Sequence, residues 1–193
     1  SGSYVRRYAQ FYDAIKARYP QLHIISTVGG KDFLGARYPA LEGKTEIVDE
    51  HYYRNASQME ENAGQYDHYD RSGPKIFVGE WATREGQPTP NSNAALGDAA
   101  WMTGMERNSD LVIMASYCPL FVNVDHGGMQ WRSDLIGYDA LPSYGSPSYY
   151  AQVLFSNHLG NKIIPLTTEN IPTQLTKLNA RDSAAGRRPK TID

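Results

Sequence analysis

The stretch Pro74-Lys75-Ile76-Phe77-Val78-Gly79-Glu80-Trp81-Ala82 decides the fold. Its apolar run is rich in β-branched and aromatic residues, which is typical of a buried parallel strand. The run ends in Gly79-Glu80-Trp81, so a carboxylate stands where a buried strand meets a loop. Because ligands bind at the carboxyl ends of strands in α/β sheets and barrels, Glu80 is a candidate catalytic residue. The alternative is a structural Glu that pairs with a neighbouring Arg or Lys.

The composition indicates a globular domain and excludes several classes of function. The chain has 193 residues, of which 40% are hydrophobic and 21% are charged. A net charge of −2 gives no electrostatic footprint for nucleic-acid binding. No apolar run approaches the roughly 20 residues of a membrane span. The N-terminal Ser1-Gly2-Ser3 is not a signal peptide, and the sequence leaves a secreted, periplasmic or cytoplasmic location open. Cys118 is the single cysteine, so an intrachain disulfide is excluded.

Helical and strand patterns alternate along the chain. Apolar residues at three- and four-residue steps predict helices over residues 4–19, 57–69, 91–107 and 146–160. Short apolar runs predict strands over residues 22–28, 46–50, 75–82, 111–116 and 161–166. Ser57-Gln58-Met59-Glu60 has the form of a capping box, and Ser146-Pro147 has the form of a helix start. Such alternation predicts an α/β fold with a parallel sheet and right-handed crossovers.

The remaining segments are predicted to be irregular. Residues 29–44 show only a weak helical signal, and residues 181–193 are polar enough for a frayed tail. Residues 120–145 form a long loop that carries Trp131, Tyr138 and Tyr144, and long loops of this kind are usually functional. Only four strands alternate with helices, whereas a (β/α)₈ barrel needs eight. The chain is therefore either a small open sheet or part of a barrel.

Five segments together resemble the α-L-arabinofuranosidases of glycoside hydrolase family fifty-one. They are Tyr8-Ala9-Gln10-Phe11-Tyr12-Asp13-Ala14-Ile15-Lys16, Val48-Asp49-Glu50-His51-Tyr52-Tyr53, Phe77-Val78-Gly79-Glu80-Trp81-Ala82, Met114-Ala115-Ser116-Tyr117-Cys118-Pro119-Leu120-Phe121-Val122-Asn123 and Tyr144-Gly145-Ser146-Pro147-Ser148-Tyr149-Tyr150. The resemblance covers about residues 4 to 170. It implies that residues 1–160 are the second half of a (β/α)₈ TIM barrel, strands five to eight. It also implies that residues 161–193 hold the first strand of a C-terminal β-sandwich and a polar tail.

The resemblance implies a retaining glycosidase that removes α-L-arabinofuranosyl residues from plant polysaccharides or oligosaccharides. Retaining enzymes use a nucleophilic carboxylate and a second carboxyl group that acts as acid and then base. Glu80 matches the position of the nucleophile. The acid/base Glu of the family follows an Asn, and no matching Asn-Glu occurs here; we expect it just before residue 1. The expected partners are the arabinose-containing substrate and the missing half-barrel, supplied by the same or another chain, with pairing of two copies as the alternative.

The expected substrate-binding residues are His51, Tyr53, Trp81, Asn123 and Trp131. His51 and Tyr53 end the strand before Glu80, where a His or Tyr orients the nucleophile by hydrogen bonding; the alternative for Tyr53 is a core position with a solvated hydroxyl. Trp81 and Trp131 offer flat faces for a sugar ring, or else pack at the base of a loop. Asn123 follows the last barrel strand and is placed to reach a sugar hydroxyl.

No cofactor or metal is expected. The histidines lack the i, i+4 spacing with a supporting carboxylate that a zinc site needs. Two alternatives to the arabinofuranosidase hypothesis stay open at this stage. One is a related retaining glycosidase that cuts xylan or glucan. The other is a non-catalytic half-barrel that binds carbohydrate or a partner chain.

Overall fold

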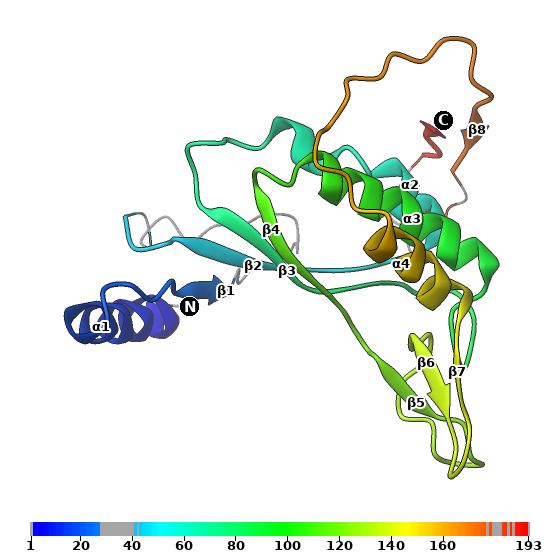
Figure 1. Cartoon of the computed structure of the whole chain (residues 1–193), viewed down its shortest axis with the longest axis horizontal. Coiled ribbons are helices and arrows are strands. Elements are labelled where there is room, and N and C mark those ends of the chain that lie inside the picture. Colours follow the sequence, from blue (N-terminus) through cyan, green and yellow to red (C-terminus); the bar gives the residue numbers. More distant parts are fainter. Residues whose placement is uncertain are drawn as a thin grey trace. The chain divides into compact units, whose positions relative to one another are not determined.

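The chain has an α/β fold in the computed structural model (Figure 1), which describes residues 2–27, 41, 43–176, 178, 183–184, 186 and 188–192. The helices are α1 (Gly2–Arg18), α2 (Ala56–Glu61), α3 (Ser92–Arg107) and α4 (Pro147–Asn157), with a 3₁₀ helix η2 (Gln65–His68). The strands are β1 (Ile25–Thr27), β2 (Ile47–Arg54), β3 (Lys75–Thr83), β4 (Val112–Tyr117), β5 (Phe121–Asn123), β6 (Ile136–Tyr138), β7 (Ser143–Gly145), β8 (Gln174–Leu175) and β9 (Thr191–Ile192). The predicted α/β class is confirmed.

The main sheet contains the four strands β1-β2-β3-β4, whose order in the sheet equals their order in the chain. The pairs β1–β2 and β3–β4 are parallel, as the alternation of helices and strands predicts. The interior residues of β3, Ile76 and Val78, are completely buried. The strand that the sequence placed over residues 22–28 is shorter, and within the described residues it spans only Ile25–Thr27.

The chain folds into two compact units. The first comprises residues 1–52, 69–81 and 109–117, and the second comprises residues 53–68, 82–108 and 118–193. The first unit holds α1 and most of the main sheet. In the second unit, α3 packs against both α2 and α4 (Figure 1). The core of this unit includes Met59, Tyr66 and Trp101. The first two are completely buried, and Trp101 is almost completely buried.

The N-terminal cap of α2 is Asn55 and not the predicted Ser57. The Asn55 side chain accepts from the Gln58 N–H at 2.8 Å, and the Gln58 side chain accepts from the Asn55 N–H at 3.0 Å. The capping box is therefore Asn55-Ala56-Ser57-Gln58, which has the same spacing two residues earlier. The helix ends at Glu61 instead of continuing to residue 69, because the chain turns into the short helix η2. The sequence offers Asn91 or Ser92 as the cap of α3, and the structure has Asn91; the predicted start of α4 at Ser146 is confirmed.

The segment 120–145 is not a loop without structure of its own. It contains a three-stranded sheet in which β5 and β6 are parallel and β6 and β7 are antiparallel. Each strand is three residues long, which is too short for an alternating pattern to be recognised in the sequence. Gly137 lies beneath the Tyr144 ring, and a Cβ at this position would come within 2.3 Å of that ring.

The predicted strand at residues 161–166 is wrong. These residues are irregular, and Ile163, Ile164 and Leu166 are exposed. An apolar run needs a partner strand to become a strand, and the second unit provides none to this run within the described residues. The expected frayed tail is also partly wrong. Near the C-terminus β9 pairs with β8, and Ile192 is buried.

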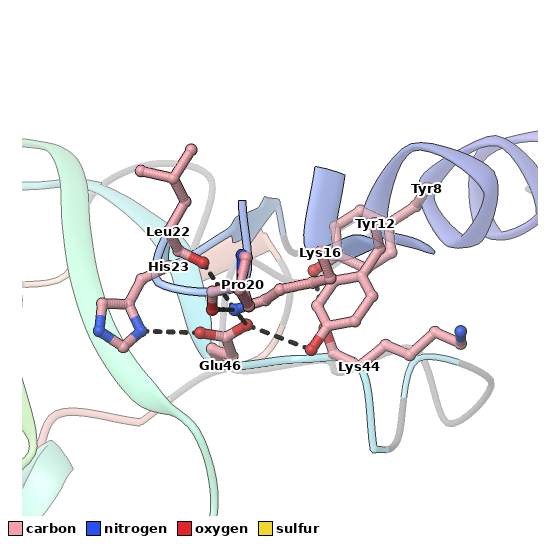
Figure 2. A network of polar contacts seen from close by, with 8 residues as sticks. All are labelled: Tyr8, Tyr12, Lys16, Pro20, Leu22, His23, Lys44 and Glu46. Carbon is pink, nitrogen blue, oxygen red and sulfur yellow. Dashed lines mark hydrogen bonds and ion pairs between the residues drawn. The ribbon is translucent and has the colours of Figure 1, made fainter. Parts of the chain in front are cut away.

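The helix α1 is anchored to the start of β2 by the Glu46 network (Figure 2). The Glu46 carboxylate pairs with Lys16, lies 2.7 Å from His23 Nδ1 and accepts from the Tyr12 hydroxyl at 3.1 Å. The hydrogen bond from the Lys16 ammonium holds the pKa of Glu46 below its usual value. Through Tyr12 and Lys16, this network holds one side of α1 against the start of β2.

Tyr8 lies on the same side of α1. Its hydroxyl donates to the Lys44 carbonyl at 2.9 Å (Figure 2), and burial raises the pKa of Tyr8 to about 12. The weak helical signal predicted over residues 29–44 falls largely outside the described residues.

Candidate active site

A β-bulge in β3 sets the direction of the Glu80 side chain. Val78 pairs with Ala115 and Trp81 with Tyr117, so β3 advances three residues while β4 advances two. The extra residue lies at Gly79-Glu80. Before the bulge, Phe77 and Gly79 share one face of β3, since a Cβ on Gly79 would lie 3.1 Å from the Phe77 ring. Strict alternation would point Glu80 to the opposite face; a bulge removes that alternation and redirects the side chain.

The bulge brings Glu80 to His51 on the neighbouring strand β2. Glu80 Oε2 lies 3.5 Å from His51 Nδ1, and the other ring nitrogen of His51, Nε2, lies 2.9 Å from Asp49 Oδ2. The three side chains thus form a line in the order Asp49, His51, Glu80. The Glu80 side chain is 41% exposed and His51 is 25% exposed, so a ligand can reach the carboxylate while the imidazole is partly shielded.

The strand β4 fixes the bulge from the other side. The Ser116 hydroxyl donates to the Gly79 carbonyl at 2.7 Å. The Trp81 ring packs edge-on against Tyr117 with ring centroids 5.2 Å apart, and Trp81 is 3% exposed. Of the two hypotheses for Trp81, this burial favours packing at the base of the site over a freely accessible stacking face.

Three expected substrate-binding residues, Tyr53, Asn123 and Trp131, lie in the second unit. The Tyr53 ring is 39% exposed and carries the Arg84 guanidinium at 4.3 Å from its centroid, which is a cation–π contact. Trp131 is 61% exposed, as a stacking surface for a sugar requires. Asn123 Oδ1 accepts from the Asp125 N–H at 2.9 Å, so part of this side chain stabilises a turn.

Asp134 is a buried carboxylate that the sequence did not single out as a site residue. It is 1% exposed, and neither carboxylate oxygen has a hydrogen-bond partner among the described residues. Burial raises the pKa of Asp134, and the nearby Arg84 charge opposes that rise. The backbone N–H groups of Ser133 and Asp134 both donate to the Pro88 carbonyl, which holds this segment in place.

Other kinds of site find no support in the described part of the chain. The described His, Cys, Asp and Glu residues include no group of three or more that could hold a metal ion. None of the described helices combines the length and apolar character that a membrane crossing requires.

Asp49 contacts His51 in the candidate site, and the sequence did not predict this contact. Its signal is the spacing to His51, because residues i and i+2 of a strand lie on one face.

Comparisons with known proteins identify the family. Residues 78–185 match the model of the α-L-arabinofuranosidase C-terminal domain, and residues 1–71 match that of the α-L-arabinofuranosidase 1 domain. An extracellular exo-α-L-arabinofuranosidase of Streptomyces chartreusis is 40% identical over 171 residues, which are 86% of this chain and 20% of that protein. Arabidopsis thaliana α-L-arabinofuranosidase 1 is 38% identical over 89% of this chain and 24% of its own length.

Solved structures agree with these matches. An arabinose-bound MgGH51 α-L-arabinofuranosidase superposes with a TM-score of 0.76 and 34% identity, over 91% of this chain and 29% of that structure. A Thermotoga maritima α-L-arabinofuranosidase with bound arabinose has a TM-score of 0.67 at 15% identity, which supports the fold alone. A carboxylate near the carboxyl end of the parallel strand β3 agrees with these matches. The chain belongs to the α-L-arabinofuranosidase family. It spans between a fifth and a quarter of the length of the two curated relatives.

Proposed function

We propose that this chain is the nucleophile-bearing part of a retaining glycoside hydrolase that removes α-L-arabinofuranosyl residues from arabinose-containing polysaccharides or oligosaccharides. The observation that carries the proposal is Glu80, a half-exposed carboxylate that a bulge redirects toward His51 near the carboxyl end of the parallel strand β3. The names of the family models and relatives support the substrate class.

The proposed reaction has two steps. In the first, a Glu80 oxygen attacks the anomeric carbon and the glycosidic bond breaks, while a second carboxyl group protonates the departing oxygen. In the second, that group takes a proton from water, and the water oxygen displaces Glu80 with overall retention. We propose that the second carboxyl group belongs to the missing half of a (β/α)₈ barrel, for which residues 1–160 supply strands five to eight. Residues 161–193 would then begin the C-terminal β-sandwich.

The proposed roles of the other site residues follow from their surroundings. His51 orients the Glu80 carboxylate. Trp81 supports it from below through its packing on Tyr117. Trp131 offers an exposed aromatic face to the sugar or the polymer, and Tyr53 contributes the exposed part of a ring that also carries Arg84. Asn123 retains its amide nitrogen for a sugar hydroxyl, since the described turn uses the oxygen.

The test is Glu80→Gln in the intact protein, which removes the negative charge and keeps the shape of the side chain. We expect turnover of an aryl α-L-arabinofuranoside to fall to less than about one per cent, because a carboxamide at position 80 cannot form the covalent intermediate. Retained activity above that level would refute the assignment of Glu80. An aryl xylopyranoside that is cut faster than the arabinofuranoside would refute the substrate class, and an inverted product would refute the two-step mechanism.

A further inference from the structure

The geometry points to Asp49 as a positioning residue that holds His51 against the nucleophile, in a space that exists only because residue 79 is glycine. This inference deepens the proposed function and rests on it. Asp49 does not touch the substrate in this role. It acts through the imidazole of His51.

The first observation is the hydrogen bond between Asp49 and His51. Asp49 Oδ2 lies 2.9 Å from His51 Nε2, and the two residues lie on the same face of β2 because they are two positions apart. A carboxylate can only accept here, so the contact requires a proton on Nε2. The imidazole then presents Nδ1 to Glu80, and when the ring is protonated it donates to both carboxylates. Asp49 therefore fixes both the ring plane and the nitrogen that faces Glu80.

The second observation is the space that Asp49 occupies. A Cβ built on Gly79 would lie 2.0 Å from Asp49 Oδ1 and 2.9 Å from its Cγ, so any side chain at position 79 must displace the carboxylate. Gly79 does not have a left-handed backbone that would itself demand glycine. The requirement for glycine here comes from the close approach of Asp49 and of the Phe77 ring.

The third observation concerns the other carboxylate oxygen. Asp49 Oδ1 is buried and has no hydrogen-bond partner among the described residues. A buried acceptor without a partner costs folding free energy. An apolar residue at position 49 would avoid that cost, so stability alone does not explain an aspartate here. Orientation of His51 does.

The experiment is a double-mutant cycle on the intact protein, with Asp49→Ala, Gly79→Ala and the combined variant. Each single change frees His51 from its carboxylate, and we expect kcat to fall by about 10- to 100-fold with a smaller change in KM. In the combined variant the methyl group added at position 79 takes the space that the carboxylate of Asp49 vacated, and only the Phe77 ring, 3.1 Å away, must shift by a few tenths of an ångström. The loss should then equal that of Asp49→Ala alone, because both changes remove the same contact. Losses that multiply, or an Asp49→Ala variant within about twofold of wild type, would overturn the inference.

A conservative variant and a spectroscopic measurement separate positioning from folding. Asp49→Asn fits the same space and retains an oxygen that can accept from Nε2, so its kcat should lie between those of wild type and Asp49→Ala. In the ¹⁵N spectrum of labelled histidine, Nε2 of His51 should carry the proton in wild type and lose that preference in Asp49→Ala. An unchanged spectrum would overturn the inference whatever the activity. Asp13→Asn, which alters an exposed ion pair with Lys44, is the matched control and should leave both readouts unchanged.

The experiment also distinguishes the two proposals. If Glu80→Gln is inactive and Asp49→Ala behaves like wild type, only the positioning role of Asp49 fails. If Glu80→Gln stays active, the proposed function fails even where the ¹⁵N spectrum shows that Asp49 orients His51.

Discussion

His51 Nδ1 lies 3.5 Å from Glu80 Oε2, across the boundary between the neighbouring strands β2 and β3. This distance is longer than a good hydrogen bond, and catalytic hydrogen bonds often shorten only when substrate is bound. In the proposed function, these two residues form the reactive group near the carboxyl ends of the inner strands β2 and β3.

The first prediction concerns His51 itself. His51→Ala removes the group that orients Glu80, and we expect kcat on an aryl arabinofuranoside to fall by about 10²- to 10⁴-fold in the intact protein. Steady-state kinetics measures this loss. His126→Ala is the control, because His126 is exposed in the segment after β5. Equal effects of the two substitutions would show that the His51–Glu80 contact plays no part in turnover.

The second prediction concerns the packing of α3 against the turn that follows α2 in the second unit. A Cβ on Gly104 would lie 1.9 Å from the Ala63 carbonyl oxygen, which is backbone and cannot rotate away. Alanine is the better helix former, yet Gly104→Ala should destabilise the protein by about 1–3 kcal/mol through overpacking. Thermal unfolding measures the change. Gly160→Ala meets only an ordinary contact at 3.7 Å and should leave the melting temperature within about a degree or two. A rise in melting temperature for Gly104→Ala would contradict the packing argument.

The third prediction concerns the Glu46 network at acidic pH. Its hydrogen bond with Lys16 lowers the pKa of Glu46 in the folded state. A carboxyl group with a lowered folded pKa stabilises the protein above its ordinary pKa near 4.5, and that stabilisation is lost as the pH falls through the folded pKa. We therefore expect the amide protons of α1 to exchange faster at low pH, relative to those of α3.

Glu46→Gln should weaken the protection of α1 at neutral pH by about 1 kcal/mol and remove the acid-dependent part of the loss. Hydrogen exchange followed by mass spectrometry compares the two helices. Glu169→Gln is the control for a carboxylate on an exposed segment. If α1 in the Glu46→Gln variant keeps the acid dependence of wild type, another group controls the anchoring of this helix.

The sequence predicted the elements whose signals are local. The helix starts at Asn91 and Ser146 depend on a capping side chain, and the strand that carries Glu80 depends on one apolar run. The bulge at Gly79-Glu80 was not predictable, because it is a difference in register between two strands that only their pairing reveals. The strand predicted at residues 161–166 is absent for a related reason. Its apolar residues satisfied a local pattern, and strand formation depends on a partner that the pattern does not contain.

The contact between Asp49 and His51 likewise could not be predicted from a local sequence pattern alone. The i, i+2 spacing places both side chains on one face of a strand, but many such pairs do not touch. What selects this pair is the space left by Gly79 on the next strand. Tyr53 and Asn123 could be named as polar residues at strand ends. The Arg84 partner of Tyr53 comes from another segment of the chain, whereas the Asp125 N–H that bonds Asn123 lies in the turn directly after β5.

The last prediction concerns the edges of the main sheet. In the described part of the chain, β1 and β4 each have a neighbouring strand on one side only. Four consecutive residues of β4, Ile113 to Ser116, are exposed, and Ile113 and Met114 are 44% and 41% accessible. An exposed apolar edge pairs readily with another strand, so we expect residues 1–193 alone to associate or to require a complementary segment. We favour the complementary half of a barrel over self-pairing, because it would also supply the second carboxyl group.

Size-exclusion chromatography with light scattering on the 193-residue chain tests this expectation. Met114→Lys places a charge on the exposed edge strand and should shift the chain toward the monomer, because a lysine at an edge opposes strand pairing. Leu141→Lys is the matched control: Leu141 is 96% exposed but lies outside the main sheet, so it should leave the association unchanged. A wild-type chain that elutes as a 21.6 kDa monomer with one cooperative melting transition would show that the open edges of β1 and β4 are tolerated.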